Sequence, residues 1–157
     1  MTNINTIGLD VEKSAGLITS LNKLLSSYQI QYMNARGFHW NIKGADFFEL
    51  HAKFEEVYND LLLKVDEIAE RILTIEGVPL HAFSDYIEVS DIEEEKGVSD
   101  GKLALNNLLI GFTKIIIAQR AILEQAGDAG DEGTVALMSD YISQQEKLVW
   151  MLRSYLN

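Results

Sequence analysis

The chain has 157 residues, of which 47% are hydrophobic and only one is proline, so it can bury a substantial core and is expected to form one domain over residues 1–157. Its 24 acidic residues outnumber its 13 basic ones, and the net charge of -11 disfavours polyanionic partners such as nucleic acid. The absence of cysteine excludes disulfides, thiolate metal ligands and cysteine nucleophiles.

The N-terminal residues show no basic segment followed by an apolar run, and no apolar stretch approaches the roughly 18 residues that a membrane span requires. We therefore expect a cytoplasmic protein without a membrane partner. Residues 1–9 precede the first periodic pattern and are expected to form a flexible N-terminal tail.

Four apolar patterns with helical spacing follow one another, and no strand pattern is evident. The first predicts a helix from about residue 10 to 36, which Gly37 is well placed to end. The second begins at Asp46, a residue type favoured as an N-cap, and runs to the stop signals at Gly77 and Pro79.

The third pattern predicts a helix over about residues 99–126, which the sequence GDAGDEG ends, and the fourth runs from about Val135 almost to the C-terminus. The first and third connections are short, whereas the second covers roughly 22 residues up to Val98 and is long enough to cross a bundle. The predicted fold is therefore all-α, a ferritin-like four-helix bundle with one long crossover, in which we expect a short helix near residues 84–89.

Helical bundles often hold metal ions between facing helices, which directs attention to acidic pairs on one helix face. Asp66 and Glu70 are one turn apart, so their carboxylates can converge on one hard cation. Such a pair alone is more typical of a solvated helix face. Here, however, Val65, Ile68 and Ile72 place it at the edge of a buried stripe, where two like charges are costly without a cation.

His39 and His51 flank the start of the second helix, although each could equally be a capping or carbonyl-bonding residue. His51 and Asp66 are fifteen residues apart, roughly 22 Å along one helix, so they cannot share an ion within one chain. They nevertheless face about the same side, because fifteen steps of about 100° return to within about 60° of the start. An antiparallel second chain would bring histidines onto carboxylates, which predicts a metal site shared between two subunits and generated twice by symmetry.

The usual single-chain di-iron site of helical bundles needs Glu-x-x-His pairs on two helices. No histidine in this chain has a glutamate three residues before it, so that site is absent.

The run from His39 to Ile72, HWNIKGADFFELHAKFEEVYNDLLLKVDEIAERI, resembles the signature of the Dps proteins, the miniferritins named as DNA-binding proteins from starved cells. The order and interval of the four ligand candidates match the family pattern, and the helix lengths agree over nearly the whole chain. The resemblance implies that His39 and His51 of one subunit and Asp66 and Glu70 of its two-fold neighbour bind two irons at each inter-subunit ferroxidase centre.

Two further residues acquire a meaning from the resemblance. Glu55 falls where family members often carry an Asp that is a ligand or lies just behind the ligands, and its longer side chain departs from that pattern. Trp40 matches a tryptophan beside the family's iron site, where it packs the interface or takes up oxidising equivalents. Interface packing is the favoured role.

The resemblance also implies a hollow dodecamer that takes up Fe(II), oxidises it preferably with hydrogen peroxide, and stores ferric mineral, which protects against oxidative stress. The mixed histidine and carboxylate ligand set suits iron, and Zn(II) could substitute for it. Asp128, Asp131 and Glu132 lie at the turn where family assemblies form acidic three-fold pores, although a merely hydrophilic turn explains them as well.

One departure from the family name concerns DNA. Members that bind DNA commonly use a tail rich in lysine or arginine, but here Asp10 and Glu12 stand against the single Lys13 in the first sixteen residues. We therefore expect no direct DNA binding. Two other functions remain open from the residues alone, a zinc- or manganese-binding bundle and a metal-free structural assembly.

Overall fold

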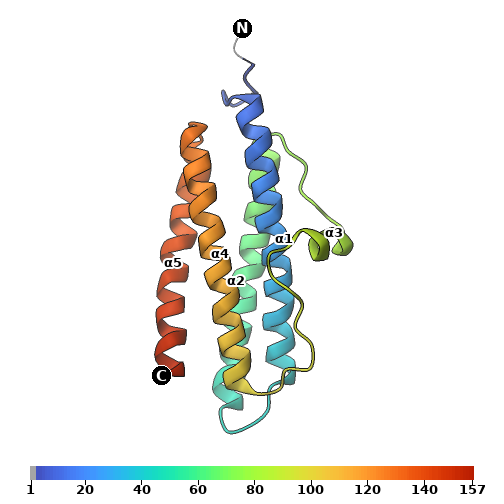
Figure 1. The fold of residues 1–157 in the computed structure, drawn as a ribbon, viewed down its shortest axis with the longest axis vertical. Helices are drawn as coiled ribbons and strands as arrows, with labels where there is room; N and C mark the ends of the chain where they lie inside the picture. The colour runs from blue at the N-terminus through green and yellow to red at the C-terminus, as the bar shows by residue number, and fades with distance from the viewer. Residues whose placement is uncertain (1–2) are drawn as a thin grey trace.

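The computed structural model describes residues 3–157, which form five helices and no named strand. Four long helices make up a bundle of two antiparallel pairs, and the short α3 lies outside the bundle beside α1 (Figure 1). The helices are α1 (Val11–Asn41), α2 (Phe47–Thr74), α3 (Phe83–Val89), α4 (Gly101–Asp128) and α5 (Glu132–Leu156). The predicted all-α four-helix bundle, with one long crossover that contains a short helix, is confirmed.

The core forms where the apolar stripes of the four long helices meet. Each helix places a large side chain inward at every third or fourth residue, as an amphipathic helix must. Because these side chains leave water together, their burial is the main force that holds the bundle closed. Fully or almost fully buried examples are Leu17, Leu21 and Leu24 of α1, Phe54, Leu61 and Ile68 of α2, Leu105, Phe112 and Ile115 of α4, and Met138, Tyr141 and Leu152 of α5.

A ring of three hydrogen bonds interrupts this apolar core. The Tyr28 hydroxyl donates to Gln119 Oε1, Gln119 Nε2 donates to Gln145 Oε1, and Gln145 Nε2 donates back to the Tyr28 hydroxyl, at 2.5, 2.7 and 2.7 Å. Burial raises the pKa of Tyr28 well above its usual value, so its hydroxyl keeps its proton. The ring links α1, α4 and α5 at one level of the bundle and satisfies polar groups that would be costly to bury alone.

Helix α1 continues to Asn41, so the prediction that it ends at Gly37 is wrong. Phe38 packs against Phe54 of α2 with ring centroids 5.6 Å apart, and His39 beside it is also buried. These contacts with α2 carry the helix past the glycine. The turn into α2 is made instead at Gly44, whose φ of 118° is readily adopted only by glycine.

An aspartate stands at the N-cap position of each of the helices α2, α4 and α5. Asp46 occupies the predicted N-cap position of α2, but its side chain accepts no capping hydrogen bond. Asp100 caps α4 by accepting from the backbone N–H of Leu103, and Asp131 caps α5, which therefore begins three residues before Val135.

The crossover from α2 to α4 runs back along the bundle on the side of α1 (Figure 1). Two asparagines of α1 hold it there through its backbone. Asn22 donates to the carbonyl of Val78 at 3.0 Å and accepts from the N–H of Leu80 at 2.8 Å. Asn34 makes the same pair of contacts with residues 93–95, each at 2.9 Å.

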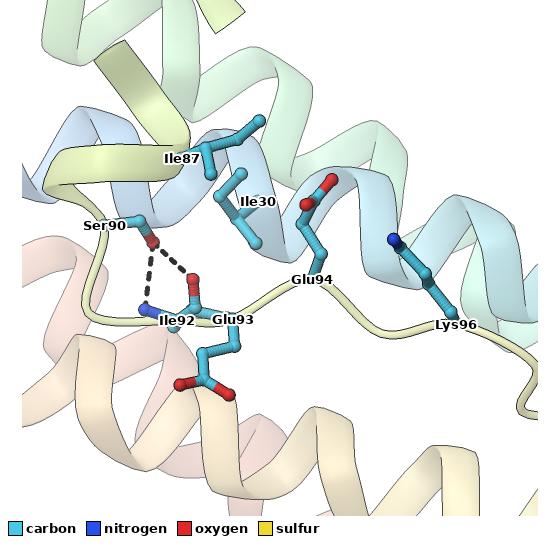
Figure 2. A pocket seen from close by; sticks show the side chains of 7 residues that line it. All are labelled: Ile30, Ile87, Ser90, Ile92, Glu93, Glu94 and Lys96. Carbon is cyan, nitrogen blue, oxygen red and sulfur yellow. Dashed lines mark hydrogen bonds between the residues drawn. The ribbon is translucent and has the colours of Figure 1, made fainter. Parts of the chain in front are cut away.

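A groove of about 550 Å³ lies between α1, α3 and this crossover. Figure 2 shows Ile30 of α1 and Ile87 of α3 facing it, together with the short turn that follows α3. In that turn the Ser90 hydroxyl donates to the carbonyl of Ile92 at 2.8 Å and accepts from its N–H at 2.9 Å. None of the four predicted metal ligands lines this groove.

The segment before α1 packs against the end of α2. Thr6 donates its backbone N–H to Glu76 Oε1 at 2.9 Å, and its hydroxyl bonds the same oxygen. Asn5 Oδ1 accepts from the N–H groups of Ile7 and Leu9 and shapes the turn. Residues 1 and 2 lie outside the described residues, and flexibility of the predicted tail over 1–9 stays a prediction that would require these bonds to open.

Helix α4 is long and apolar enough, by length and composition alone, to cross a membrane. This differs from the sequence expectation, because Lys114 interrupts the apolar run without making it polar on average. The buried side chains of α4 include Leu108, Phe112 and Ile115, which face the core of the bundle. A core helix meets the same criteria as a membrane span.

Candidate metal centre

The end of α1 and the start of α2 bring His39 and His51 into direct contact. Their rings stack with centroids 3.8 Å apart and an interplanar angle of 12°. Each Nδ1 lies 2.7 Å from the backbone carbonyl of the other histidine. His39 is buried and His51 half-buried. The two residues predicted to act together from their positions in sequence are therefore neighbours in space.

These two hydrogen bonds define the tautomer of both rings. A carbonyl oxygen can only accept, so each Nδ1 carries the proton and donates it. In a neutral imidazole the other nitrogen, Nε2, then presents a lone pair, which is the form that binds a metal. The carbonyl of His39 lies in the last turn of α1, where carbonyls lack a partner within the helix, so the bond from His51 also satisfies the helix end.

Aromatic side chains of α2 enclose the histidine pair. Phe47 stacks on His51 with centroids 4.9 Å apart, and Tyr58 meets His39 edge-on at 5.3 Å. Sequence reasoning missed both residues. Tyr58 follows His51 by two helical turns, and this spacing on one face is the signal that was available.

Trp40 lies beside this cluster but points to its exposed side. Its side chain is 58% exposed, and the guanidinium of Arg36 lies 5.1 Å from its ring centre. Arg36 also lies over the rings of Tyr32 and Tyr58 and donates to the Tyr32 hydroxyl at 2.6 Å. These α1 residues line a second groove of about 630 Å³. The large exposed ring favours an interface role for Trp40.

The predicted carboxylates lie further along α2. Asp66 and Glu70 are both exposed, and so is Glu55 near the histidines. Within residues 3–157, the side chains of these three residues take part in no hydrogen bond or ion pair. They are free to accept a cation from outside the chain.

The face of α2 that carries the carboxylates also exposes apolar side chains. Leu62, Leu63 and Leu73 are 48%, 61% and 57% exposed. Leu62 lies one turn before Asp66, and Leu73 less than one turn after Glu70. A combination of bare leucines and unpaired carboxylates is typical of a surface that another protein covers.

Within residues 3–157 no group of three or more His, Asp or Glu side chains could hold a metal ion. This agrees with the separation of roughly 22 Å between His51 and Asp66 along α2. One chain presents two histidines near the start of α2 and two carboxylates toward its other end.

The turn between α4 and α5 carries the three acids predicted to form a pore. Asp128 and Glu132 are exposed, and the backbone carbonyl of Asp128 accepts from Lys13 Nζ at 2.9 Å. Asp131 is buried, caps α5 through Thr134, and forms an ion pair with Arg71. Its carboxylate is therefore occupied within the subunit, which sets it apart from the other two.

Comparison with known proteins identifies the class to which this fold and these half-sites belong. The model of the ferritin-like domain family matches residues 18–157, and the chain belongs to that family. Within it the chain is a member of the Dps proteins. It is 45% identical over 152 residues to a "DNA protection during starvation protein" of Porphyromonas gingivalis, covering 97% of this chain and 96% of the relative.

Solved structures give the same result. A crystal structure of a Dps protein from Vibrio cholerae, described as a member of a broad superfamily of ferritin-like diiron-carboxylate proteins, has a TM-score of 0.97 and 55% identity and covers 100% of this chain and 98% of that one. A Dps protein from Bacillus brevis has a TM-score of 0.90 and 29% identity over 93% of this chain and 98% of that one. The resemblance found in the sequence is thereby confirmed at the level of family and fold.

Proposed function

We propose that the protein is an iron-sequestering miniferritin whose ferroxidase centres are completed between two subunits. Membership of the ferritin-like Dps family supports iron storage in general terms. The observation that carries the finer proposal is the pair of complementary half-sites on one chain. His39 at the end of α1 and His51 at the start of α2 have free Nε2 atoms, and unpaired carboxylates lie toward the other end of α2.

The ligand chemistry suits Fe(II) as the substrate. Asp66 and Glu70 of one subunit, with His39 of its neighbour, would compensate the divalent charge of a first iron. His51, with Glu55 near it, would hold a second iron more weakly or through water. An incomplete protein shell leaves positions for an oxidant.

The proposed reaction pairs two irons with one molecule of hydrogen peroxide. Each Fe(II) loses one electron and becomes Fe(III). The O–O bond accepts both electrons and breaks, and two protons are taken up to give two molecules of water. Consuming the oxidant with a pair of irons prevents the one-electron reaction that would release a hydroxyl radical. Oxidative protection and storage of ferric mineral then follow from the same step.

The partner in this proposal is a second copy of the chain packed antiparallel on the α2 face. Leu62 and Leu73 would be buried there, which would favour association independently of metal. Two-fold symmetry would complete two centres in each pair. Repetition of such pairs would give the hollow dodecamer, with Asp128 and Glu132 as the exposed acids for iron uptake at its pores. Cytoplasmic location belongs to the same proposal.

The test couples oligomeric size to ferroxidation. Leu62→Glu places a charge where a 48% exposed leucine lies, so the subunit should keep its helical content but fail to assemble. Size and activity would be measured together, by light scattering and by ferric absorbance after anaerobic Fe(II) loading and addition of peroxide. A folded monomer that oxidised Fe(II) at the wild-type rate would reject the shared centre.

The same measurement separates the alternatives left open by the sequence. A zinc- or manganese-binding bundle would bind the metal and release it unchanged when peroxide is added. A metal-free structural assembly would show no Fe(II) binding, and changes at Asp66 and Glu70 would leave its behaviour intact. Only the miniferritin proposal expects peroxide-dependent formation of ferric species that requires both residues.

A further inference from the structure

Arg71, the residue after Glu70, connects α2 to the start of α5. Arg71 Nη2 lies 2.5 Å from Asp131 Oδ1, and Arg71 Nε donates to the Thr134 hydroxyl at 2.9 Å. Asp131 also accepts from the N–H of Thr134 at 3.0 Å and from its hydroxyl at 2.5 Å. The guanidinium, the aspartate and the threonine thus form one closed network between two helices.

This network is largely buried and closely fitted. The side chains of Arg71 and Asp131 are 19% and 1% exposed, and Thr134 is fully buried. A Cβ atom on Gly133 would lie 2.6 Å from both terminal nitrogens of the guanidinium, so the glycine leaves the space that Arg71 occupies. Two guanidinium nitrogens thus bond two different residues, which fixes both the position and the rotation of the arginine.

Among the described residues, 3–157, the Glu70 side chain has no hydrogen-bond or ion-pair partner that could hold it in place. It lies in the second-last turn of α2, which ends at Thr74, and helix ends are the parts most prone to fraying. The position of its carboxylate therefore depends on how firmly the backbone of these last turns is held. Arg71 supplies that anchor, and Asp131 occupies the guanidinium so that it does not pair with the neighbouring Glu70.

We propose that Arg71 is a positioning residue for the metal ligand Glu70, acting through the buried Asp131 and Thr134. The inference rests on the proposed function, because it takes Glu70 as a ligand. Metal ligands must be placed within tenths of an ångström, and residues that orient ligands typically change metal affinity by about 10- to 100-fold. Arg71 would act on the backbone that carries the ligand and would not touch the metal.

The test uses Co(II), a divalent ion that peroxide-free buffer leaves unoxidised, titrated calorimetrically into the assembled apoprotein. Arg71→Gln should weaken binding about tenfold. Arg71→Lys keeps the charge but loses the fork, so its affinity should fall between those of Arg71→Gln and the wild type. Arg120→Gln is the matched control, because Arg120 forms an exposed ion pair with Glu146, away from α2, and should leave affinity unchanged.

A double variant shows whether Arg71 acts through Glu70. In a Glu70→Gln background, where the ligand is already lost, Arg71→Gln should cause no further loss of affinity. A merely structural role would lower the melting temperature without this dependence on Glu70. If Arg71→Gln does not assemble, Arg71→Lys with and without Glu70→Gln gives the same comparison.

The outcomes distinguish this inference from the proposed centre. If Glu70→Gln weakens Co(II) binding but Arg71→Gln and Arg71→Lys bind like the wild type, the positioning role is rejected and the centre stands. The positioning role is also rejected if Arg71→Gln weakens binding equally in both backgrounds. If Glu70→Gln itself has no effect, Glu70 is not a ligand and both proposals are rejected.

Discussion

The hydrogen bond that fixes the tautomer of His39 goes to the backbone of residue 51, not to the His51 side chain. Its Nδ1 donates to the His51 carbonyl at 2.7 Å, while the two rings stack at 3.8 Å. A side-chain substitution at position 51 therefore removes one ring but leaves the hydrogen bond that fixes the tautomer of the other.

The first prediction follows from this relationship. His51→Ala should keep one iron per centre, because His39 retains its acceptor and still presents Nε2. The second iron and the fast paired oxidation should be lost. Calorimetric Fe(II) titration under anaerobic conditions counts the sites, and a variant that lost both irons would reject the division of labour between the two histidines.

Substitution of the carboxylates should have a larger effect. Asp66→Ala or Glu70→Ala should abolish tight Fe(II) binding, a loss of at least about 100-fold, because each removes a charged ligand outright. Assembly should survive, since the apolar stripes and not the metal hold the subunits. Glu56→Gln on the same helix is the control: Glu56 is exposed and pairs with Lys53, so binding should not change.

The buried hydrogen-bond ring should affect the free energy of unfolding and not the binding of iron. Tyr28→Phe removes the hydroxyl that bonds both Gln119 and Gln145, and leaving these amides unsatisfied should cost about 1–3 kcal/mol of unfolding free energy. Urea denaturation followed by circular dichroism measures the loss. Tyr32→Phe should cost less, because the Tyr32 hydroxyl is only partly buried, and equal losses would contradict the role of burial.

A pH-dependent contact joins the N-terminal segment to the turn that follows α2. Hydrogen bonds from the Thr6 hydroxyl and backbone N–H lower the pKa of Glu76 from its usual 4.5. A lowered folded-state pKa gives stabilisation that is present above pH 4.5 and is lost as the pH falls through the folded-state value.

The melting temperature of Glu76→Gln should therefore be lower than that of the wild type at neutral pH. This difference in melting temperature should shrink as the pH falls below 4.5. Thermal melts across this range measure the effect. Glu124→Gln, a change toward the end of α4, should show no such trend. A Glu76→Gln difference that stayed constant with pH would show that charge at Glu76 is not responsible.

Direct binding to DNA is expected to fail at physiological salt. The net charge of -11 repels the phosphate backbone, and the segment before α1 offers no cluster of basic residues. A gel-shift assay without added divalent cations tests this. Tight retardation under those conditions would overturn the expectation, whereas retardation only with divalent cations would indicate bridging by the metal.

The long helices could be predicted because the core repeats at every third or fourth residue, and that pattern is local. Their ends were harder, because they depend on contacts between helices. The packing of Phe38 on Phe54 carries α1 beyond Gly37, and the capping by Asp131 starts α5 early. A local sequence pattern does not show that residues 38 and 54 lie close together in the folded chain.

The same distinction applies to the candidate centre. The spacing of Asp66 and Glu70 indicates a shared face from helix geometry alone. The contact between Arg71 and Asp131 joins residues that are 60 positions apart, so it becomes visible only when α2 and α5 are placed together. Gly133 was the available signal, but a glycine near a helix start does not by itself indicate which side chain fills the space beside it.

The placement of histidines and carboxylates at opposite ends of α2 has a consequence for the newly made chain. In the proposed assembly a single subunit carries only incomplete sites, so it cannot accumulate oxidised iron before it meets another copy. Formation of each centre then follows mass action in protein, and oxidation at high dilution should depend on the square of the subunit concentration. Synthesis rate, rather than any added switch, would decide when the iron chemistry begins.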